Sequence, residues 1–240
     1  MQSDGFSIVA CGTLRREVSY LRENGFLDAE RVLYTGAGLH AKPEELERQL
    51  VRQLGRARES SSRVIVVYGS KCYLDPNQPS RTIDSIVDEA GARRVSAQGC
   101  IDMLCDAECR RELSGGESVL WLSPGWIEHW RRIWQEYLGW EAADANMNFP
   151  GFYRKAILLD PQPLAIFDSW AAHSPEKILE FSDWTRLPVE SRPVTLDRLK
   201  SLLMQCRTEG RNAGSPEETQ RGRRWPRAGG DRRPGGQSSR

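Results

Sequence analysis

The sequence lacks any apolar run of the roughly 18 to 20 residues that a membrane-spanning helix needs. Its first residues carry no basic side chain, and the apolar stretch at 6–11 is too short for the core of a signal peptide. We therefore expect a cytosolic (cytoplasmic) protein with no membrane partner. In a reducing compartment, the 6 cysteines are expected to be free thiols, metal ligands or redox groups and not a disulfide framework.

Several common functional motifs are also missing. The 240 residues contain no P-loop, no GxGxxG motif, no paired zinc-finger pattern and no internal repeat. The length is sufficient for one large domain or for two smaller ones that share a core. Function must therefore be inferred from where individual reactive residues fall along the fold.

The net charge of +1 conceals two segments of opposite sign. Residues 207–240 contain nine Arg, no Lys and four acidic residues, a net charge of +5, which leaves −4 for residues 1–206. We expect this Arg- and Gly-rich tail to be disordered, because it cannot bury enough apolar surface to offset the loss of chain entropy. Nonspecific contact with nucleic acid through the tail is one interpretation. A solvated extension is favoured, because the rest of the chain is acidic.

Residues 1–206 alternate between strand-like and helix-like segments. Short apolar and β-branched runs predict strands at 6–10, 31–35, 63–68, 92–96, 118–122, 156–160 and 188–190. Helical patterns lie between them, at 14–24, 43–54, 83–90, 101–113, 127–138, 175–184 and 196–206. The alternation predicts an α/β fold with Rossmann-like parallel-sheet layers in one domain, 1–206, which can divide into two similar lobes, about 1–116 and 117–206.

Three cysteines and a histidine follow successive predicted strands. Cys11, His40, Cys72 and Cys100 come after the first four strands, at spacings of 29, 32 and 28 residues, about one strand–helix unit each. Because the strands of a parallel sheet all point the same way, we expect these side chains to meet at the carboxyl edge of the sheet. Ligands bind at that edge in such folds.

The residue types at this edge indicate a metal centre. Three thiolates and an imidazole match the ligands of a tetrahedral zinc ion or of an iron–sulfur cluster. Three thiolates alone would leave one metal position open, which favours catalysis or substrate ligation. We expect Gly12, Gly69 and Trp126 to wall the pocket, since glycine permits close approach of a large ligand. Burial as a small apolar side chain is the alternative for each cysteine taken singly.

The remaining cysteines have weaker assignments. Cys105 and Cys109 lie four residues apart on the predicted helix 101–113. Core packing is favoured for them, over a role as additional thiol ligands or as a resolving thiol for Cys100. Cys206 ends the last predicted helix and is expected to be incidental.

Four polar residues are secondary candidates. Glu128 and His129 stand next to Trp126 and could reach the pocket. Asp160 ends a predicted strand and is either a contributor from the second lobe or an ordinary turn residue. His173 precedes a predicted helix and is interpreted as a loop or helix-entry residue.

Short motifs around these residues occur in a defined order. They are Ile8-Val-Ala-Cys11-Gly12, Gly38-Leu-His40, Tyr68-Gly69 with Cys72, Gly99-Cys100-Ile101 and Ser123-Pro-Gly-Trp126. In this order, over about residues 6–205, they resemble a domain-of-unknown-function family, number 1638. The resemblance implies that Cys11, Cys72 and Cys100 are shared ligand thiols. Members of that family often accompany corrinoid proteins and corrinoid-dependent methyltransferases, so the resemblance also implies such a partner and, through it, a corrinoid.

Two principal hypotheses for function result. In the first, the chain is a metal- or iron–sulfur-binding thiolate protein that serves corrinoid-linked methyl or one-carbon transfer, as a catalyst or as an accessory. In the second, it is a non-catalytic module that binds a metal or redox cofactor and delivers it to a partner. A third and weaker hypothesis is association with nucleic acid through the tail. The sequence leaves open whether the protein is an enzyme, which substrate it takes and its oligomeric state.

Overall fold

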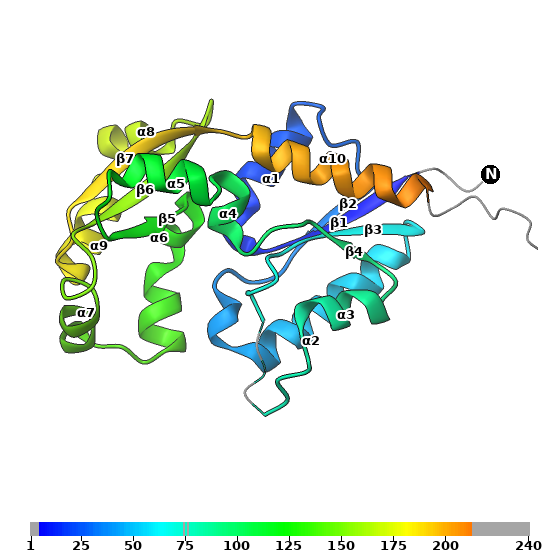
Figure 1. The fold of residues 1–240 in the computed structure, drawn as a ribbon, viewed down its shortest axis with the longest axis horizontal. Coiled ribbons are helices and arrows are strands. Elements are labelled where there is room, and N and C mark those ends of the chain that lie inside the picture. The colour runs from blue at the N-terminus through cyan, green and yellow to red at the C-terminus, as the bar shows by residue number, and fades with distance from the viewer. Residues whose placement is uncertain (1–4, 74, 76, 213–240) are drawn as a thin grey trace, which may run out of the picture.

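The computed structural model describes residues 5–73, 75 and 77–212, and its strands form two parallel sheets that lie side by side (Figure 1). The first sheet has the order β2-β1-β3-β4 and the second the order β5-β6-β7. The strands are β1 (Phe6–Ala10), β2 (Arg31–Tyr34), β3 (Arg63–Val67), β4 (Arg93–Arg94), β5 (Val119–Leu122), β6 (Lys155–Gln162) and β7 (Val189–Thr195). Every pairing between neighbouring strands is parallel, which confirms the predicted α/β class.

Helices connect the strands, as parallel pairing requires. In the first half they are η1 (Gly12–Leu14), α1 (Arg15–Glu23), η2 (Leu39–Ala41), α2 (Pro43–Arg58), α3 (Ile83–Glu89), α4 (Cys100–Leu104) and α5 (Ala107–Ser114). The second half contributes α6 (Pro124–Trp130), the π-helical η3 (Arg131–Tyr137), α7 (Ala142–Asn148), α8 (Ile166–His173), α9 (Glu176–Thr185) and α10 (Asp197–Asn212). Although α10 follows the second sheet, it packs back on the first, beside α4 and β3 (Figure 1).

The apolar core has three clusters, of which the central one joins the two sheets. Val9 on β1 belongs to a cluster with α2 and α3, where the predicted stripe Leu46, Leu50 and Leu54 is buried. Ile8, the adjacent residue on β1, faces the central cluster instead, as expected when successive strand residues point to opposite faces. The central cluster also holds residues of β5, β6 and α10, while the third cluster contains the Trp-rich helices α6 and η3.

Several predicted boundaries are wrong. The single helix predicted at 101–113 is two helices, because Asp106 caps a new helix by accepting a hydrogen bond from the backbone N–H of Cys109 at 3.0 Å. The strand predicted at 188–190 extends to Thr195. The last helix continues past Cys206 to Asn212, so residues 207–212 are helical; the rest of the predicted disordered tail lies outside the described residues.

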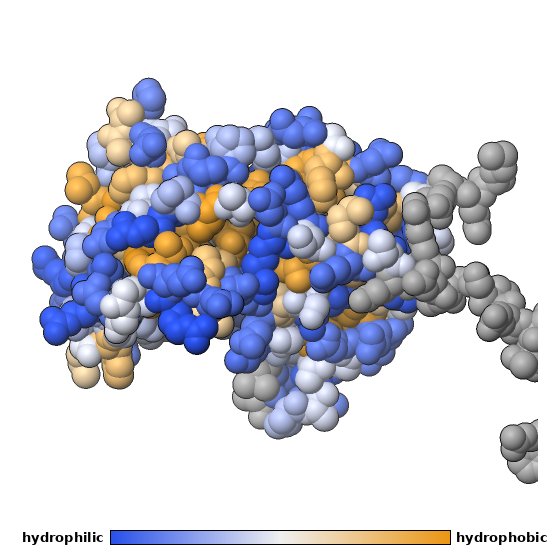
Figure 2. All heavy atoms as spheres, turned by 45° about the horizontal axis from the view of Figure 1, so that its top comes forward, coloured by the Kyte–Doolittle hydropathy of each residue, from blue (hydrophilic) through white to orange (hydrophobic). Residues whose placement is uncertain are grey.

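Within the part of the chain that the structure describes, no helix combines the length and the apolar character needed to cross a bilayer. Hydrophilic side chains cover most of the face seen in Figure 2, and apolar atoms show between them mainly toward its middle. The largest exposed apolar side chains, Met147 and Phe152, lie at the end of α7 and in the loop that follows it.

One acidic side chain, Glu17, is buried in this core. Glu17 on α1 is fully buried, and neither of its carboxylate oxygens has a hydrogen-bond partner among the described residues. Burial raises the pKa of Glu17 from 4.5 to about 7, because the charged form loses its hydration. The folded protein therefore holds a proton on Glu17 that the unfolded chain releases over that pH range.

This proton makes the stability depend on pH. Because the folded state binds one proton more than the unfolded state between pH 4.5 and 7, stability falls as pH rises through this window. We expect the free energy of unfolding of the wild type, relative to Glu17→Gln, to fall by about 3 kcal/mol across it. Urea unfolding at a series of pH values measures the difference. Glu23→Gln, an exposed change on the same helix, is the control and should give a constant difference. A constant difference for Glu17→Gln as well would show that Glu17 ionises normally in the fold.

Candidate functional site

A cavity of about 410 Å³ lies at the carboxyl edge of the first sheet. The loops after β2, β3 and β4 contribute His40, Cys72 and Cys100 to its wall, and α6 contributes Trp126. These four predicted site residues, which span 87 positions of the chain, thus line one cavity. We call it the thiol cavity.

Cys11 lies behind this wall and not in it. It follows the central strand β1, its backbone N–H donates to the carbonyl of Val67 at 3.2 Å, and its residue surface is only 9% exposed. Its Sγ is 3.1 Å from the hydroxyl of Thr13, and that same hydroxyl also hydrogen-bonds to Cys100. One threonine thus connects the buried thiol to a thiol of the cavity wall.

The three thiols influence one another electrostatically. Burial, and then the neighbouring Cys100 and Cys11, together raise the pKa of Cys72 to about 12, because an adjacent thiolate repels a second one. Burial and then Cys11 raise the pKa of Cys100 to about 11. Cys72 and Cys100 are therefore protonated at neutral pH. A metal cation bound among them would stabilise the thiolates and so oppose both causes of the shift.

An aromatic wall encloses one side of the thiols. The indole N–H of Trp126 donates to the Sγ of Cys100 at 3.3 Å, which lowers the pKa of that thiol against the larger effect of burial. The imidazole of His40 lies against the same indole, with ring centroids 5.1 Å apart. Desolvation lowers the pKa of His40, so its ring is neutral at neutral pH and has a lone pair available for a metal or a proton.

The two glycines predicted to wall the pocket have another role. A Cβ on Gly69 would lie 2.2 Å from the carbonyl oxygen of Gln98, and one on Gly12 would lie 2.7 Å from that of Thr35. Neither distance can hold a side chain, so both glycines let neighbouring loops of the sheet edge pack backbone against backbone. Neither glycine belongs to the lining of the thiol cavity, and Gly12 lines a neighbouring cavity.

The metal-binding interpretation has support from chemistry but not from preorganised geometry. Three thiols and an imidazole are the donor set that soft metals prefer. Within the described ranges, however, no three His, Cys, Asp or Glu side chains are already disposed around one point in a way that could hold an ion. Binding would require side-chain rotation, chiefly to bring Cys11, Cys72 and Cys100 to a common centre.

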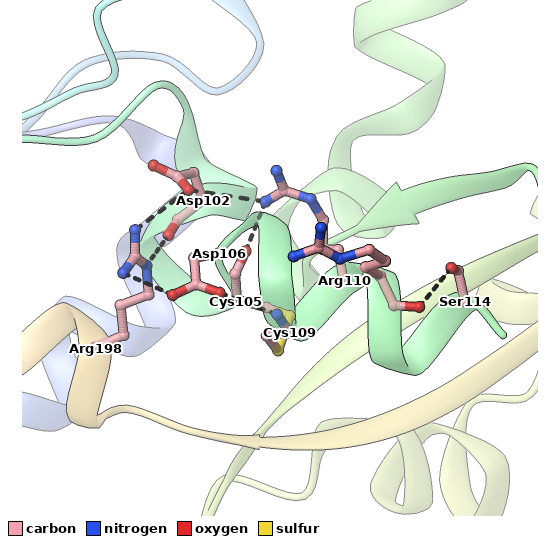
Figure 3. The surroundings of a disulfide bond; sticks show 8 residues. Asp102, Cys105, Asp106, Cys109, Arg110, Ser114 and Arg198 are labelled. Atoms are coloured by element: carbon pink, nitrogen blue, oxygen red, sulfur yellow. Dashed lines mark hydrogen bonds and ion pairs between the residues drawn. A yellow bond between two sulfur atoms is a disulfide. The ribbon is translucent and has the colours of Figure 1, made fainter. Parts of the chain in front are cut away.

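Cys105 and Cys109 form a disulfide with each other, with Cα atoms 5.5 Å apart (Figure 3). The expectation of free thiols is therefore correct for Cys11, Cys72 and Cys100 and wrong for this pair. Cys105 follows α4 and Cys109 lies in the first turn of α5, so the pair ties the two short helices together. In this oxidised form neither sulfur is available as an additional ligand.

Charged side chains surround the disulfide (Figure 3). Arg198 from α10 lies 3.3 Å from the carboxylate of Asp102 and 3.1 Å from that of Asp106. Arg110 reaches toward Asp102 from the other side, at 3.9 Å, and donates to the carbonyl of Cys105 at 2.6 Å. Asp102 and Arg110 also line the thiol cavity, so this network forms one of its sides.

The secondary candidates lie elsewhere. Glu128 and His129 line a second cavity of about 410 Å³ next to α1, where Glu128 pairs with Arg16. Asp160 accepts a hydrogen bond from the backbone N–H of Ile166 at 2.8 Å and so fixes the start of α8, which agrees with the turn interpretation. His173 ends α8 instead of entering a helix. Cys206 is buried in the central cluster.

Sequence reasoning missed several residues of the site. Thr13 hydrogen-bonds to Cys11 and Cys100, and Tyr68 is buried with its hydroxyl near Cys11 and Thr35. Tyr68 precedes Gly69 at the end of β3, which is a usable signal, since residues at strand ends meet at this edge. Lys71 and Arg110 line the thiol cavity without any local pattern that marks them.

A family model described as "Protein of unknown function (DUF1638)" matches residues 34–203. The chain belongs to the DUF1638 family. The matched segment contains His40, Cys72 and Cys100 and ends within α10, whereas β1 and Cys11 lie outside it, in contrast to the resemblance from residue 6.

No curated protein and no solved structure matches this DUF1638 chain. The family description gives no reaction, substrate or cofactor. The chemistry of the site must therefore be inferred from its residues.

The hydrogen bond from Trp126 yields a specific prediction. Trp126→Phe keeps an aromatic ring at this position but removes the N–H donor to Cys100. The pKa of Cys100 should therefore rise further. Because only the thiolate reacts, alkylation of Cys100 by iodoacetamide at about pH 9 should slow by about tenfold. Mass spectrometry of the peptides that contain each cysteine measures the rate.

Cys72 in the same molecule is the internal control, since Trp126 makes no hydrogen bond to it among the described residues. Its rate should change much less than that of Cys100. Equal changes at both cysteines would indicate that the indole controls access to the cavity and not the ionisation of Cys100.

Proposed function

We propose that this DUF1638 protein is a thiolate metal-centre protein in which Cys11, Cys72 and Cys100 hold zinc or an iron–sulfur cluster beside the thiol cavity. His40, at the rim of the cavity, would supply a fourth ligand or leave that position to a substrate. When bound, the metal would supply Lewis acidity and stabilised thiolate nucleophiles.

The proposal is supported chiefly by the coupling of the three thiols. They follow separate strands of one sheet, yet the pKa of Cys72 is raised by both of the others, and that of Cys100 by Cys11. Protonated, the three thiols pack as small apolar side chains, but once ionised they repel one another. A soft cation replaces their protons and turns the repulsion into shared ligation.

The thiol cavity provides the place for a reaction. Cys72 and Cys100 face its interior, and Trp126 and Trp121 form an aromatic part of its lining. A substrate seated there would have its reactive carbon next to the sulfurs. We propose methyl or one-carbon transfer as this reaction, with a corrinoid protein or methyltransferase as the partner; support for that part comes only from the family resemblance.

A second candidate is delivery of the metal or redox cofactor to a partner. It is favoured by the open arrangement of the ligands, because no three of the described His, Cys, Asp or Glu side chains are preformed around one ion. A site that closes only on binding can also release its ion when ligands are exchanged with another protein.

Metal titration tests the shared centre. Protein purified without oxygen is analysed for metal and acid-labile sulfide, and the reduced, metal-free chain is then titrated with Cd²⁺ while the sulfur-to-metal absorption band is followed. We expect one site, and we expect Cys11→Ala, Cys72→Ala and Cys100→Ala each to weaken binding by about 100-fold. Resistance of the bound metal to a chelator favours a catalytic centre, while ready release favours delivery.

The matched control is Cys206→Ala, which removes a cysteine from the central core cluster far along the chain from the cavity. It should leave Cd²⁺ binding unchanged. A wild-type protein that binds no metal, or variants of all four cysteines that behave alike, would rule out a shared centre.

A further inference from the structure

Two positive side chains, Lys71 and Arg110, line the thiol cavity together with Cys72 and Cys100. Lys71 precedes Cys72 and is exposed, and its ammonium has no ion pair or hydrogen bond to any other described residue. Arg110 enters from α5 and is only partly exposed. Neither charge is required by the thiols in their protonated form.

The surrounding acids do not neutralise both cations. Asp102 is the only acidic residue among the described lining of the cavity. Its carboxylate accepts from the backbone N–H of Gln98 at 3.0 Å and pairs more closely with Arg198, at 3.3 Å, than with Arg110, at 3.9 Å. Arg198 lies outside the cavity lining, so the closer ion pair of Asp102 is with a cation that does not line the cavity. The cavity itself keeps a positive excess.

The rest of the lining is suited to an organic group. Trp121 and Trp126 present indole rings and Ile101 an aliphatic side chain. A lining that combines such apolar side chains with two cations suits a molecule that has an apolar body and a negative end. A simple inorganic anion would leave the indole surface uncovered.

We propose that the thiol cavity binds a small organic carboxylate, with its carboxylate group held by Lys71 and Arg110 and its carbon body against the indoles, next to Cys72 and Cys100. Arg110 can accept a carboxylate in a two-point fork while Lys71 supplies a point charge. This assignment names the substrate class of the proposed function, but it depends only on the cavity and holds whether or not a metal is bound.

The two sulfurs allow a direct test on the full-length, reduced, metal-free protein. Iodoacetate and iodoacetamide alkylate a thiolate in the same way: the sulfur forms a bond to the CH₂ carbon, iodide leaves, and the thiol proton has passed to the buffer. Only iodoacetate carries a carboxylate. The ratio of the two rates at one cysteine therefore reports anion preference and cancels the fraction of thiolate.

We expect the iodoacetate-to-iodoacetamide ratio at Cys72 and Cys100 to exceed that of the urea-unfolded protein by about tenfold. Lys71→Gln should lower the ratio by about fivefold, since it removes one of two charges near the reagent. Arg110→Gln should do the same. Because Arg110 also donates to the carbonyl of Cys105, Arg110→Lys is added to keep the charge, and it should retain most of the preference.

Lys177→Gln is the matched control, since it removes the same charge from α9, outside the cavity lining. It should leave the ratio unchanged. A ratio no higher than that of the unfolded chain overturns the proposal, as does a high ratio that survives both Lys71→Gln and Arg110→Gln. Loss of Cd²⁺ binding in the separate titration bears on the metal centre alone and leaves this result intact.

Discussion

The site depends on the parallel pairing of β1 with β2 on one side and β3 on the other. This pairing places the ends of three strands at one edge, and the N–H of Cys11 continues it by donating to Val67. The loops that leave this edge can pack only because Gly69 and Gly12 bring backbone against backbone, at distances that exclude any side chain. Three thiols separated by whole strand–helix units are thereby brought close enough to influence one another's ionisation.

Crowding of thiols has a consequence for the resting state. Burial and mutual repulsion keep Cys72 and Cys100 protonated at neutral pH, and the hydrogen bonds from Trp126 and Thr13 to Cys100 only partly oppose this. Only a small fraction of these thiols is therefore present as the reactive thiolate at neutral pH. Two separate charge interactions are proposed at this edge of the sheet. A soft metal ion would bind the sulfurs, and the cations of the cavity would hold a carboxylate nearby.

Much of this arrangement could be predicted from the sequence. A short apolar run identified β1 and a continuous β-branched run identified β3. The rule that parallel strands share a carboxyl edge was then sufficient to place His40, Cys72 and Cys100 around one cavity. Local sequence patterns did not predict features that depend on helix capping or on contacts between residues distant in the sequence. The break at Asp106 depends on a single N-cap hydrogen bond, and it separates two cysteines that helical spacing had placed on one face. The cations of the cavity are positioned by tertiary packing, which leaves no periodic signal.

The most direct test of the account is X-ray absorption spectroscopy at the zinc edge of the zinc-loaded protein. The shared centre predicts three sulfur ligands at about 2.3 Å and one nitrogen or oxygen ligand at about 2.0–2.2 Å, from His40 or from the group that takes its place. In Cys11→Ala, one sulfur should be replaced by a light atom, because the buried thiol behind the wall is part of the same shell. A shell of nitrogen and oxygen alone, or a sulfur count unchanged by Cys11→Ala, would contradict the convergence of the three thiols on one metal.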